Sequence, residues 1–151
     1  MISILNHKIA PIANQIYEVF QVSYAVEAQL LKATDFPPLK RTANAIQQSS
    51  TMFYGYKVKD SLAAVMEIES KESGIHICSL VVSPTYFRQG IGRKLVSFAK
   101  EIGQAKTITV ETGLANGPAI SLYKNAGFVE SKQYLTDVGI WKIAFILNKT
   151  P

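Results

Sequence analysis

The most constraining feature of the sequence is a run of strand, helix and strand signals between residues 75 and 112. Residues 75–82 (IHICSLVV) are apolar at odd and even positions alike, which is typical of a strand covered on both faces. Apolar residues then recur at helical spacing, at Ile91, Leu95, Val96, Phe98, Ala99 and Ile102. Gly103 is placed to cap that helix, and residues 108–112 (ITVET) give the next strand. Such a crossover predicts parallel strands in a sheet with helices on both faces.

The flanking sequence predicts further elements around this crossover. Apolar spacing indicates a helix from Ile9, which the prolines in residues 35–39 end. Residues 51–58 and 62–69 read as a hairpin. The other expected elements are a strand at 2–5, helices at 40–48 and 118–125, and strands around Tyr134 and at 141–147. Residues 1–151 are therefore expected to form one mixed α/β (α+β) domain.

Composition limits the class of protein. Hydrophobic residues make up 48% and charged residues 18% of the chain, which is typical of a globular protein and not of a disordered one. Cys78 is the only cysteine and the histidines are His7 and His76, so we expect neither an internal disulfide nor a metal site. No apolar run approaches the roughly 18 residues that span a bilayer, and the start shows no signal peptide. We therefore expect a cytoplasmic protein without membrane contact.

The chain carries a net charge of +5, from 16 Lys and Arg against 11 Asp and Glu. Such an excess is compatible with an anionic small ligand or with nucleic acid. The basic residues are scattered and form no long run, which makes nucleic-acid binding the weaker interpretation.

A glycine-containing turn opens the helix of the crossover. Its residues are Arg88, Gln89, Gly90, Ile91, Gly92 and Arg93. The unpaired N–H groups at a helix N-terminus attract phosphate, and glycines let the main chain come close to it. A tight packing turn is an equal alternative from the glycines alone. A Walker A loop is absent. A dinucleotide fingerprint is a weak match, because Gly90 and Gly92 fit its first two glycines but Leu95 stands at the third.

Two motifs around this turn resemble those of the GNAT superfamily of N-acetyltransferases. LVVSPTYFRQGIGRKLV, residues 80–96, is similar to the acyl-CoA-binding motif, with Phe87 where glutamine or arginine is usual. NGPAISLYKNAGF, residues 116–128, is similar to the family's second motif, N-x-x-A-x-x-L-Y-x-x-x-G-F. The resemblance implies a mixed, mostly antiparallel sheet of about seven strands, in which the parallel pair splays apart to hold acyl-CoA.

The resemblance also implies where acetyl-CoA binds. The pyrophosphate is expected on the backbone amides of residues 88–93, and the pantetheine arm between the strands at 75–82 and 108–112. Main-chain groups of Leu80, Val81 and Val82 are expected to face that arm, with the Val82 N–H polarising the thioester carbonyl. Asn116 is expected to contact the pantetheine, and Ala119 to let it pass.

The chemistry requires a neutral amine and a proton for the departing thiolate. Tyr123 matches the family's general-acid tyrosine, although its helical face also suits a core residue. Glu67 and Glu69 lie two apart on one strand and are candidates for the base, with simple solvent exposure as the alternative. His76 titrates in a suitable range but stands alone, and Cys78 is expected to be buried and not to act as a nucleophile.

The acceptor is expected to be an amine on a small molecule or peptide. Tyr54, Tyr56 and residues 24–39 lie where the family builds its acceptor site. The alternatives are a non-catalytic acyl-CoA-binding or sensing domain and a basic nucleic-acid-binding module. A homodimer is expected if the apolar strand at 141–147 lies at a sheet edge.

Overall fold

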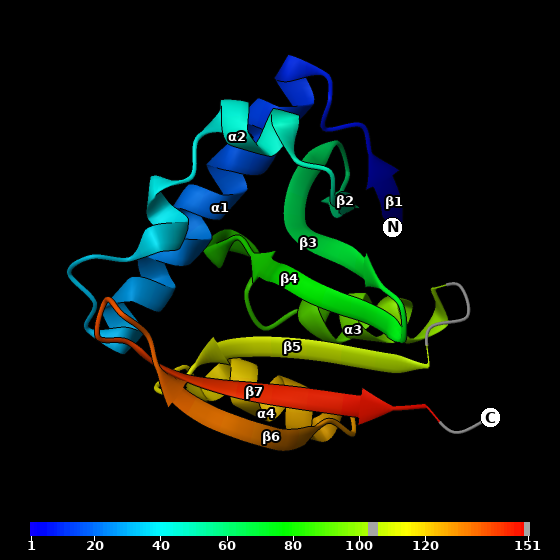
Figure 1. Cartoon of the computed structure of the whole chain (residues 1–151). Helices are drawn as coiled ribbons and strands as arrows, with labels where there is room; N and C mark the ends of the chain where they lie inside the picture. Colours follow the sequence, from blue (N-terminus) through cyan, green and yellow to red (C-terminus); the bar gives the residue numbers. More distant parts are fainter. Residues whose placement is uncertain (103–105, 150–151) are drawn as a thin grey trace.

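Figure 1 shows the computed structural model, in which a seven-stranded sheet carries helices on both faces. The structure describes residues 1–102 and 106–149. The strands are β1 (Ile2–Leu5), β2 (Met52–Val58), β3 (Ser61–Lys71), β4 (Gly74–Val82), β5 (Thr107–Gly113), β6 (Val129–Leu135) and β7 (Trp141–Asn148). The helices are α1 (Ala10–Leu31), α2 (Ala43–Gln48), α3 (Ile91–Glu101) and α4 (Gly117–Asn125), with 3₁₀ turns η1 (Pro37–Lys40) and η2 (Pro84–Tyr86). None of the helices in these ranges is long and apolar enough to span a membrane.

The sheet confirms the predicted mixed architecture. Its strand order is β1-β2-β3-β4-β5-β7-β6, with β4 at the centre. β4 and β5 pair in parallel, and every other pair is antiparallel. The parallel pairing starts at Gly74↔Thr107 and ends at Ile77↔Val110. Beyond that point the two strands separate, so the expected splay is present.

A β-bulge in β4 explains why its sequence is apolar at both parities. In the register with β3, Glu67 pairs with Ser79 but Ile68 pairs with Ile77, so Cys78 is the extra residue. The bulge changes which face of the sheet the odd-numbered side chains point to. Ile77, before the bulge, packs on the α3 side, whereas Val81, after it, packs on the α1 side. The prediction that Cys78 is buried was wrong, since the bulge leaves it exposed.

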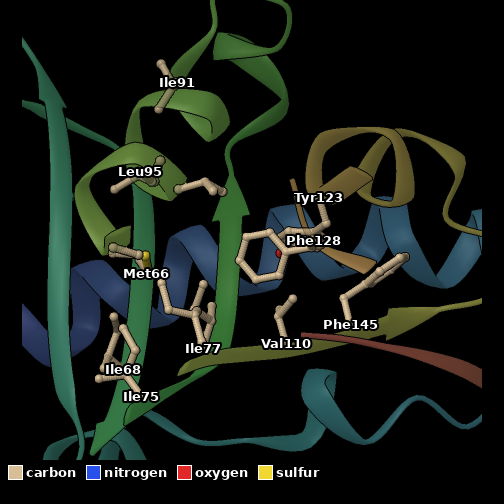
Figure 2. Packing of buried hydrophobic residues seen from close by; sticks show 14 of the residues in the cluster. Met66, Ile68, Ile75, Ile77, Ile91, Leu95, Val110, Tyr123, Phe128 and Phe145 are labelled. Carbon is tan, nitrogen blue, oxygen red and sulfur yellow. The ribbon is translucent and has the colours of Figure 1, made fainter. Parts of the chain in front are cut away.

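Two apolar layers cover the sheet. α1 packs Ile16 and Phe20 against Phe53 of β2 and Val81 of β4. On the opposite face, α3 and α4 form the larger layer, and Figure 2 shows Ile77 and Val110 packed there with aromatic side chains. The buried aromatic residues of that layer are Tyr123, Phe128 and Phe145. The central strands are thus covered by apolar side chains on both faces.

The structure corrects two local expectations and does not describe a third. The helix expected at 40–48 begins only at Ala43, because Thr42 caps it by accepting a hydrogen bond from the Ala45 N–H. The expected Gly103 cap lies outside the described residues. β7, the apolar strand expected to pair across a dimer from a sheet edge, lies between β5 and β6, so the condition for that homodimer is not met.

Replacing Gly74 by alanine should weaken the junction of β4 and β5. A Cβ atom there would lie 1.8 Å from the Thr107 carbonyl oxygen, so one of the two paired backbones would have to move. We expect the free energy of unfolding, measured in urea, to fall by about 1–3 kcal/mol. Gly117→Ala is the matched control, because a Cβ at Gly117 meets nothing within 4 Å. Equal stability of the two variants would contradict the expectation.

Candidate functional site

The separation of β4 from β5 opens onto two adjoining pockets. The first, here called the α3 cleft, has a volume of about 450 Å³ and runs from the N-terminus of α3 along the end of β4. The second, the β5 pocket, has a volume of about 470 Å³ and lies between β5, α1 and the turn joining β6 to β7. Both are within the size range of small-molecule sites. Glu27, Leu80, Asn116 and Ala119 line both, so the two pockets meet at these residues.

The α3 cleft ends at the helix mouth that the sequence singled out. Gly90 is the N-cap residue, with φ 75°, and no protein atom lies within 4 Å of where its Cβ would be. Arg88 also has a positive φ of 63°, which is uncommon for a residue with a side chain. Among the described residues no side chain caps this helix, and its first helical hydrogen bond runs from Lys94 N to Gly90 O. The amides of the first turn are therefore directed at the cleft without a partner inside the helix.

The end of β4 presents peptide groups toward the gap. A hydrogen bond of 2.8 Å from the Ser83 N–H to the Ala63 carbonyl continues the antiparallel register with β3. Because hydrogen-bonded and non-hydrogen-bonded pairs alternate, the Leu80 and Val82 peptide groups point away from β3. In the described sheet no strand pairs with them on the β5 side. Only the Val82 carbonyl has a side-chain partner among the described hydrogen bonds, the Ser23 hydroxyl at 3.0 Å.

Asn116 and Ala119 lie where the two pockets join. Asn116 is the N-cap of α4, and its Oδ1 accepts a hydrogen bond of 3.2 Å from the Ala119 N–H. Its Nδ2 donates to Thr112 Oγ1 at the end of β5, at 3.3 Å. The second motif therefore fixes the start of α4 against the strand that forms one wall of the gap.

Removing the Asn116 cap should destabilise the protein. Asn116→Ala takes away the oxygen that satisfies the Ala119 N–H, and we expect the free energy of unfolding to fall by about 1 kcal/mol. Asn116→Asp keeps a capping oxygen and should recover most of the loss. Urea unfolding of the three proteins makes the comparison, and an alanine variant as stable as the wild type would contradict the capping role.

Tyr123 combines core packing with a place at the β5 pocket. Its side chain is 3% exposed, and its ring centroid lies 5.6 Å from that of Phe128 and 5.9 Å from that of Phe145. It also lines the β5 pocket, next to Ala119. Burial raises the pKa of its phenol above the ordinary value. The hydroxyl thus stays protonated at neutral pH and can act as a proton donor.

Glu67 is held in a hydrogen-bonded cluster beneath the β5 pocket. Arg41 Nη1 and Nη2 donate to its two carboxylate oxygens at 2.7 and 2.9 Å. Thr51 Oγ1 donates to it at 2.7 Å and Ser79 Oγ at 3.2 Å, and Ser79 in turn accepts from the Tyr24 hydroxyl. Burial disfavours the charged form, but the hydrogen bonds from Arg41 and Thr51 outweigh it and hold the pKa of Glu67 below its ordinary value. Glu67 is therefore an ionised and fully occupied carboxylate.

Several other residues singled out by the sequence lie away from the pockets. Glu69 is exposed and pairs with Lys71 at 3.1 Å. His76 lies within 2.7 Å of Thr109 Oγ1, and burial lowers its pKa. Tyr54 packs on Phe98, and Tyr56 accepts a hydrogen bond from Lys94. None of Glu69, His76, Tyr54 and Tyr56 lines either pocket.

Cys78 lies in the wall of the β5 pocket. Although the residue is exposed, the surrounding protein atoms raise the pKa of its thiol to about 11, and the charges of Glu67 and Glu69 act in the same direction. The thiol is thus protonated at neutral pH, which disfavours a role as nucleophile.

Two carboxylates of the β5 pocket were not singled out as catalytic by the sequence. Glu27, on α1, accepts a hydrogen bond of 3.4 Å from Thr112 Oγ1 and lines both pockets. Glu111, on β5, accepts one of 2.7 Å from the Tyr134 hydroxyl and lies 3.9 Å from Lys142. A signal existed for Glu111, because it lies near the carboxyl end of a strand next to the splay, where ligands of α/β sheets bind.

The charges divide along the two pockets. Arg88 and Arg93 are exposed around the helix mouth. The β5 pocket is lined by three acids, Glu27, Glu111 and Asp137, against the bases Arg41 and Lys142. Since Glu67 already neutralises Arg41, the β5 pocket has an acidic excess although the whole chain is basic. The site therefore has a basic end and an acidic end that meet at Leu80, Asn116 and Ala119.

Comparison with known proteins gives a consistent family assignment. The profile of the Acetyltransferase (GNAT) family matches residues 13–128. The chain is 36% identical over 148 residues to the UPF0157 protein YqkA of Bacillus subtilis (strain 168), which covers 97% of this chain and 43% of that protein. The chain thus spans less than half the length of that relative.

Solved structures share the fold. The ribosomal-protein-S18-alanine N-acetyltransferase from Escherichia coli superimposes with a TM-score of 0.73 at 22% identity, covering 100% of this chain and 94% of that one. The PaiA N-acetyltransferase from Thermoplasma acidophilum, in complex with coenzyme A, gives 0.72 at 16% identity, covering 95% and 98%. At these identities the likeness concerns the fold alone.

Proposed function

This chain belongs to the acetyltransferase (GNAT) family, and on that premise we propose that it transfers an acetyl group from acetyl-CoA to a primary amine in a ternary complex. The gap between β4 and β5, with an anion-binding cleft at one end and an acidic pocket at the other, carries this proposal.

The α3 cleft fits the cofactor. The free amides at residues 90–93, with Arg88 and Arg93, would hold the pyrophosphate, as a helix N-terminus does. The Leu80 and Val82 peptide groups would pair with the pantetheine amides in place of a missing strand. Asn116 and Ala119 would lie beside the end of the arm. The phosphate end would thus be anchored so that the thioester points into the β5 pocket.

The residues at the junction would perform the transfer. Acetyl-CoA supplies the acetyl group as a reactive thioester. A peptide N–H at the end of β4 would polarise the thioester carbonyl as the amine nitrogen attacks. Leu80 lies at the junction of the two pockets, whereas Val82, the donor that the resemblance implied, lines the α3 cleft alone. A carboxylate would take the proton that the amine loses, and the Tyr123 hydroxyl would give a proton to the sulfur as the carbon–sulfur bond breaks. The products are an N-acetylated acceptor and the free thiol of CoA.

We propose Glu27 and Glu111 as further candidates for the base, because both line the pocket that would hold the amine. Glu67 and Glu69 stay predicted bases, although Glu67 is engaged by Arg41 and Glu69 lies outside both pockets. We expect Glu27→Gln or Glu111→Gln to lower kcat/KM by about 100-fold. Glu67→Gln and Glu69→Gln are the comparison variants. If only one of these two shows the loss, the base is there instead.

The acceptor pocket favours a small cationic amine or the amino end of a peptide. Its volume of about 470 Å³ suits a small molecule, and its acidic excess attracts an ammonium group. Residues 24–39, where the sequence predicted an acceptor site, supply Tyr24, Phe36, Pro37 and Pro38 to its walls.

Two measurements test the proposal. Isothermal titration should show saturable binding of acetyl-CoA, and its absence at millimolar ligand with folded protein would refute the proposal. An acceptor screen that follows release of the CoA thiol should then identify amines that are acetylated. Tight binding without thiol release in a broad amine screen would instead favour the alternative, an acyl-CoA-binding or sensing domain.

A further inference from the structure

Arg41 is fixed in the wall of the β5 pocket by two kinds of contact. Its guanidinium makes the paired hydrogen bonds to the Glu67 carboxylate at 2.7 and 2.9 Å. Its Cζ lies 5.8 Å from the ring centroid of Phe20 and 5.7 Å from that of Phe53, within the range of cation–π contact. A guanidinium held on one edge by a carboxylate and along its sides by rings has little freedom to turn. Its remaining donors therefore keep a constant direction.

Among the described residues, only Glu67 accepts hydrogen bonds from the Arg41 guanidinium. A guanidinium has five N–H groups, and the paired bonds to Glu67 use two of them. The Arg41 side chain is 28% exposed, whereas that of Glu67 is 3% exposed, and Arg41 is the member of the pair that lines the β5 pocket. The ion pair thus presents hydrogen-bond donors, and no acceptor, to the space where the amine would bind.

The surrounding charges decide what these donors can bind. Glu67 neutralises the guanidinium, and the other walls of the pocket carry Glu27, Glu111 and Asp137 against a single base, Lys142. These acids outnumber the remaining base, so a carboxylate ligand would meet a net negative charge, which repels it. A neutral carbonyl oxygen accepts the same hydrogen bond without that repulsion. The donors of Arg41 therefore match an amide better than an acid.

A third wall of the pocket is apolar. Phe36, from the segment after α1, packs with Ile140, from the turn between β6 and β7, and both line the β5 pocket. Pro37, Pro38 and Val138 extend this surface. An acceptor could therefore place its amine near the acids, a neutral carbonyl near Arg41 and an apolar substituent on the apolar wall.

We infer that Arg41 is a specificity-determining residue that donates a hydrogen bond to a neutral carbonyl of the acceptor, so that the enzyme prefers amines carrying an amide and an apolar group. This inference rests on the proposed acetyl transfer. Arg41 acts on the acceptor alone, because it lines the β5 pocket and not the α3 cleft.

Three amines of one carbon skeleton test this inference: leucinamide, isoamylamine, which lacks the carboxamide, and free leucine. The informative quantity is the ratio of kcat/KM for leucinamide to that for isoamylamine, compared between proteins so that the different basicities of the amines cancel. Arg41→Met combined with Glu67→Gln removes the donors without leaving a buried charge unpaired. We expect this double variant to lower the ratio by about 10-fold or more, the size of one charge-assisted hydrogen bond. In the wild type, leucine should be acetylated more slowly than leucinamide.

The single variant Glu67→Gln is the matched control, because it removes the carboxylate but keeps the guanidinium, and its ratio should stay above that of the double variant. A ratio that is the same in the double variant and the wild type, including an equal loss of activity with both amines, would overturn the inference. Calorimetric titration of leucinamide into the CoA-loaded protein measures the same contact without turnover. We expect about 10-fold weaker binding in the double variant, and equal binding would overturn the inference. Absence of thiol release with every amine would overturn the proposed transfer instead.

Discussion

Replacing Tyr123 by phenylalanine is expected to lower the rate of acetyl transfer by about 100-fold or more, while acetyl-CoA binds as tightly as in the wild type. The substitution removes one oxygen and keeps the ring that packs against Phe128 and Phe145. The hydroxyl belongs to a side chain that lines the β5 pocket, so the change acts on the chemistry at the junction. A proton donor in that position matters only when the thiolate leaves.

The pH dependence of this loss separates a general acid from other roles. Because burial raises the pKa of the Tyr123 phenol above its ordinary value, the group stays protonated across the neutral range. The ratio of wild-type to variant rates should therefore be constant between about pH 6 and 9. Tyr54→Phe is the matched control, since Tyr54 lines neither pocket. Thiol release that is unaffected by Tyr123→Phe would remove this residue from the mechanism.

Much of the fold followed from local patterns. The parallel crossover, the helix mouth at Gly90 and the second motif at Asn116 are each encoded in a short stretch, through hydrophobic period, glycine placement and capping. The local elements depend on residues close in sequence, which is why the sequence could predict them. The structure also confirms the seven-stranded mixed sheet and its splay after Ile77, which the resemblance to the GNAT family implied.

The features that were missed depend on contacts between distant segments. The bulge at Cys78 is defined only by the pairing of β4 with β3. It changes which side chains of β4 point to each face of the sheet, whereas the apolar pattern alone had indicated a strand buried on both faces. The partner of Glu67 is Arg41, which lies 26 residues away in a loop. Glu27 faces Thr112 across 85 residues. Nothing in the local sequence indicates such pairs, so these contacts could be identified only from the structure.

Replacing Arg41 by alanine should be strongly destabilising. It would leave the Glu67 carboxylate, whose side chain is 3% exposed, without its charged partner. Breaking a buried ion pair by removing one member costs about 3–5 kcal/mol, a large part of the stability of a typical domain. Lys40→Ala is the matched control one residue away, because Lys40 pairs with Asp35 at the surface and such pairs contribute about 0–1 kcal/mol.

The dependence of this loss on pH identifies its cause. In the wild type the pKa of Glu67 lies below its ordinary value, so the pair stabilises the fold above the ordinary carboxyl pKa and loses this effect as the pH falls through the lowered pKa. Without Arg41, burial would raise the pKa of Glu67, and the carboxyl group would destabilise the fold once the pH rises above its ordinary range. The difference in unfolding free energy between wild type and Arg41→Ala, measured in urea, should therefore be larger at pH 7 than at pH 4. Adding Glu67→Gln to Arg41→Ala should recover part of the loss at pH 7. A deficit of the same size at both pH values would show that lost packing on Phe20 and Phe53, and not the orphaned charge, is responsible.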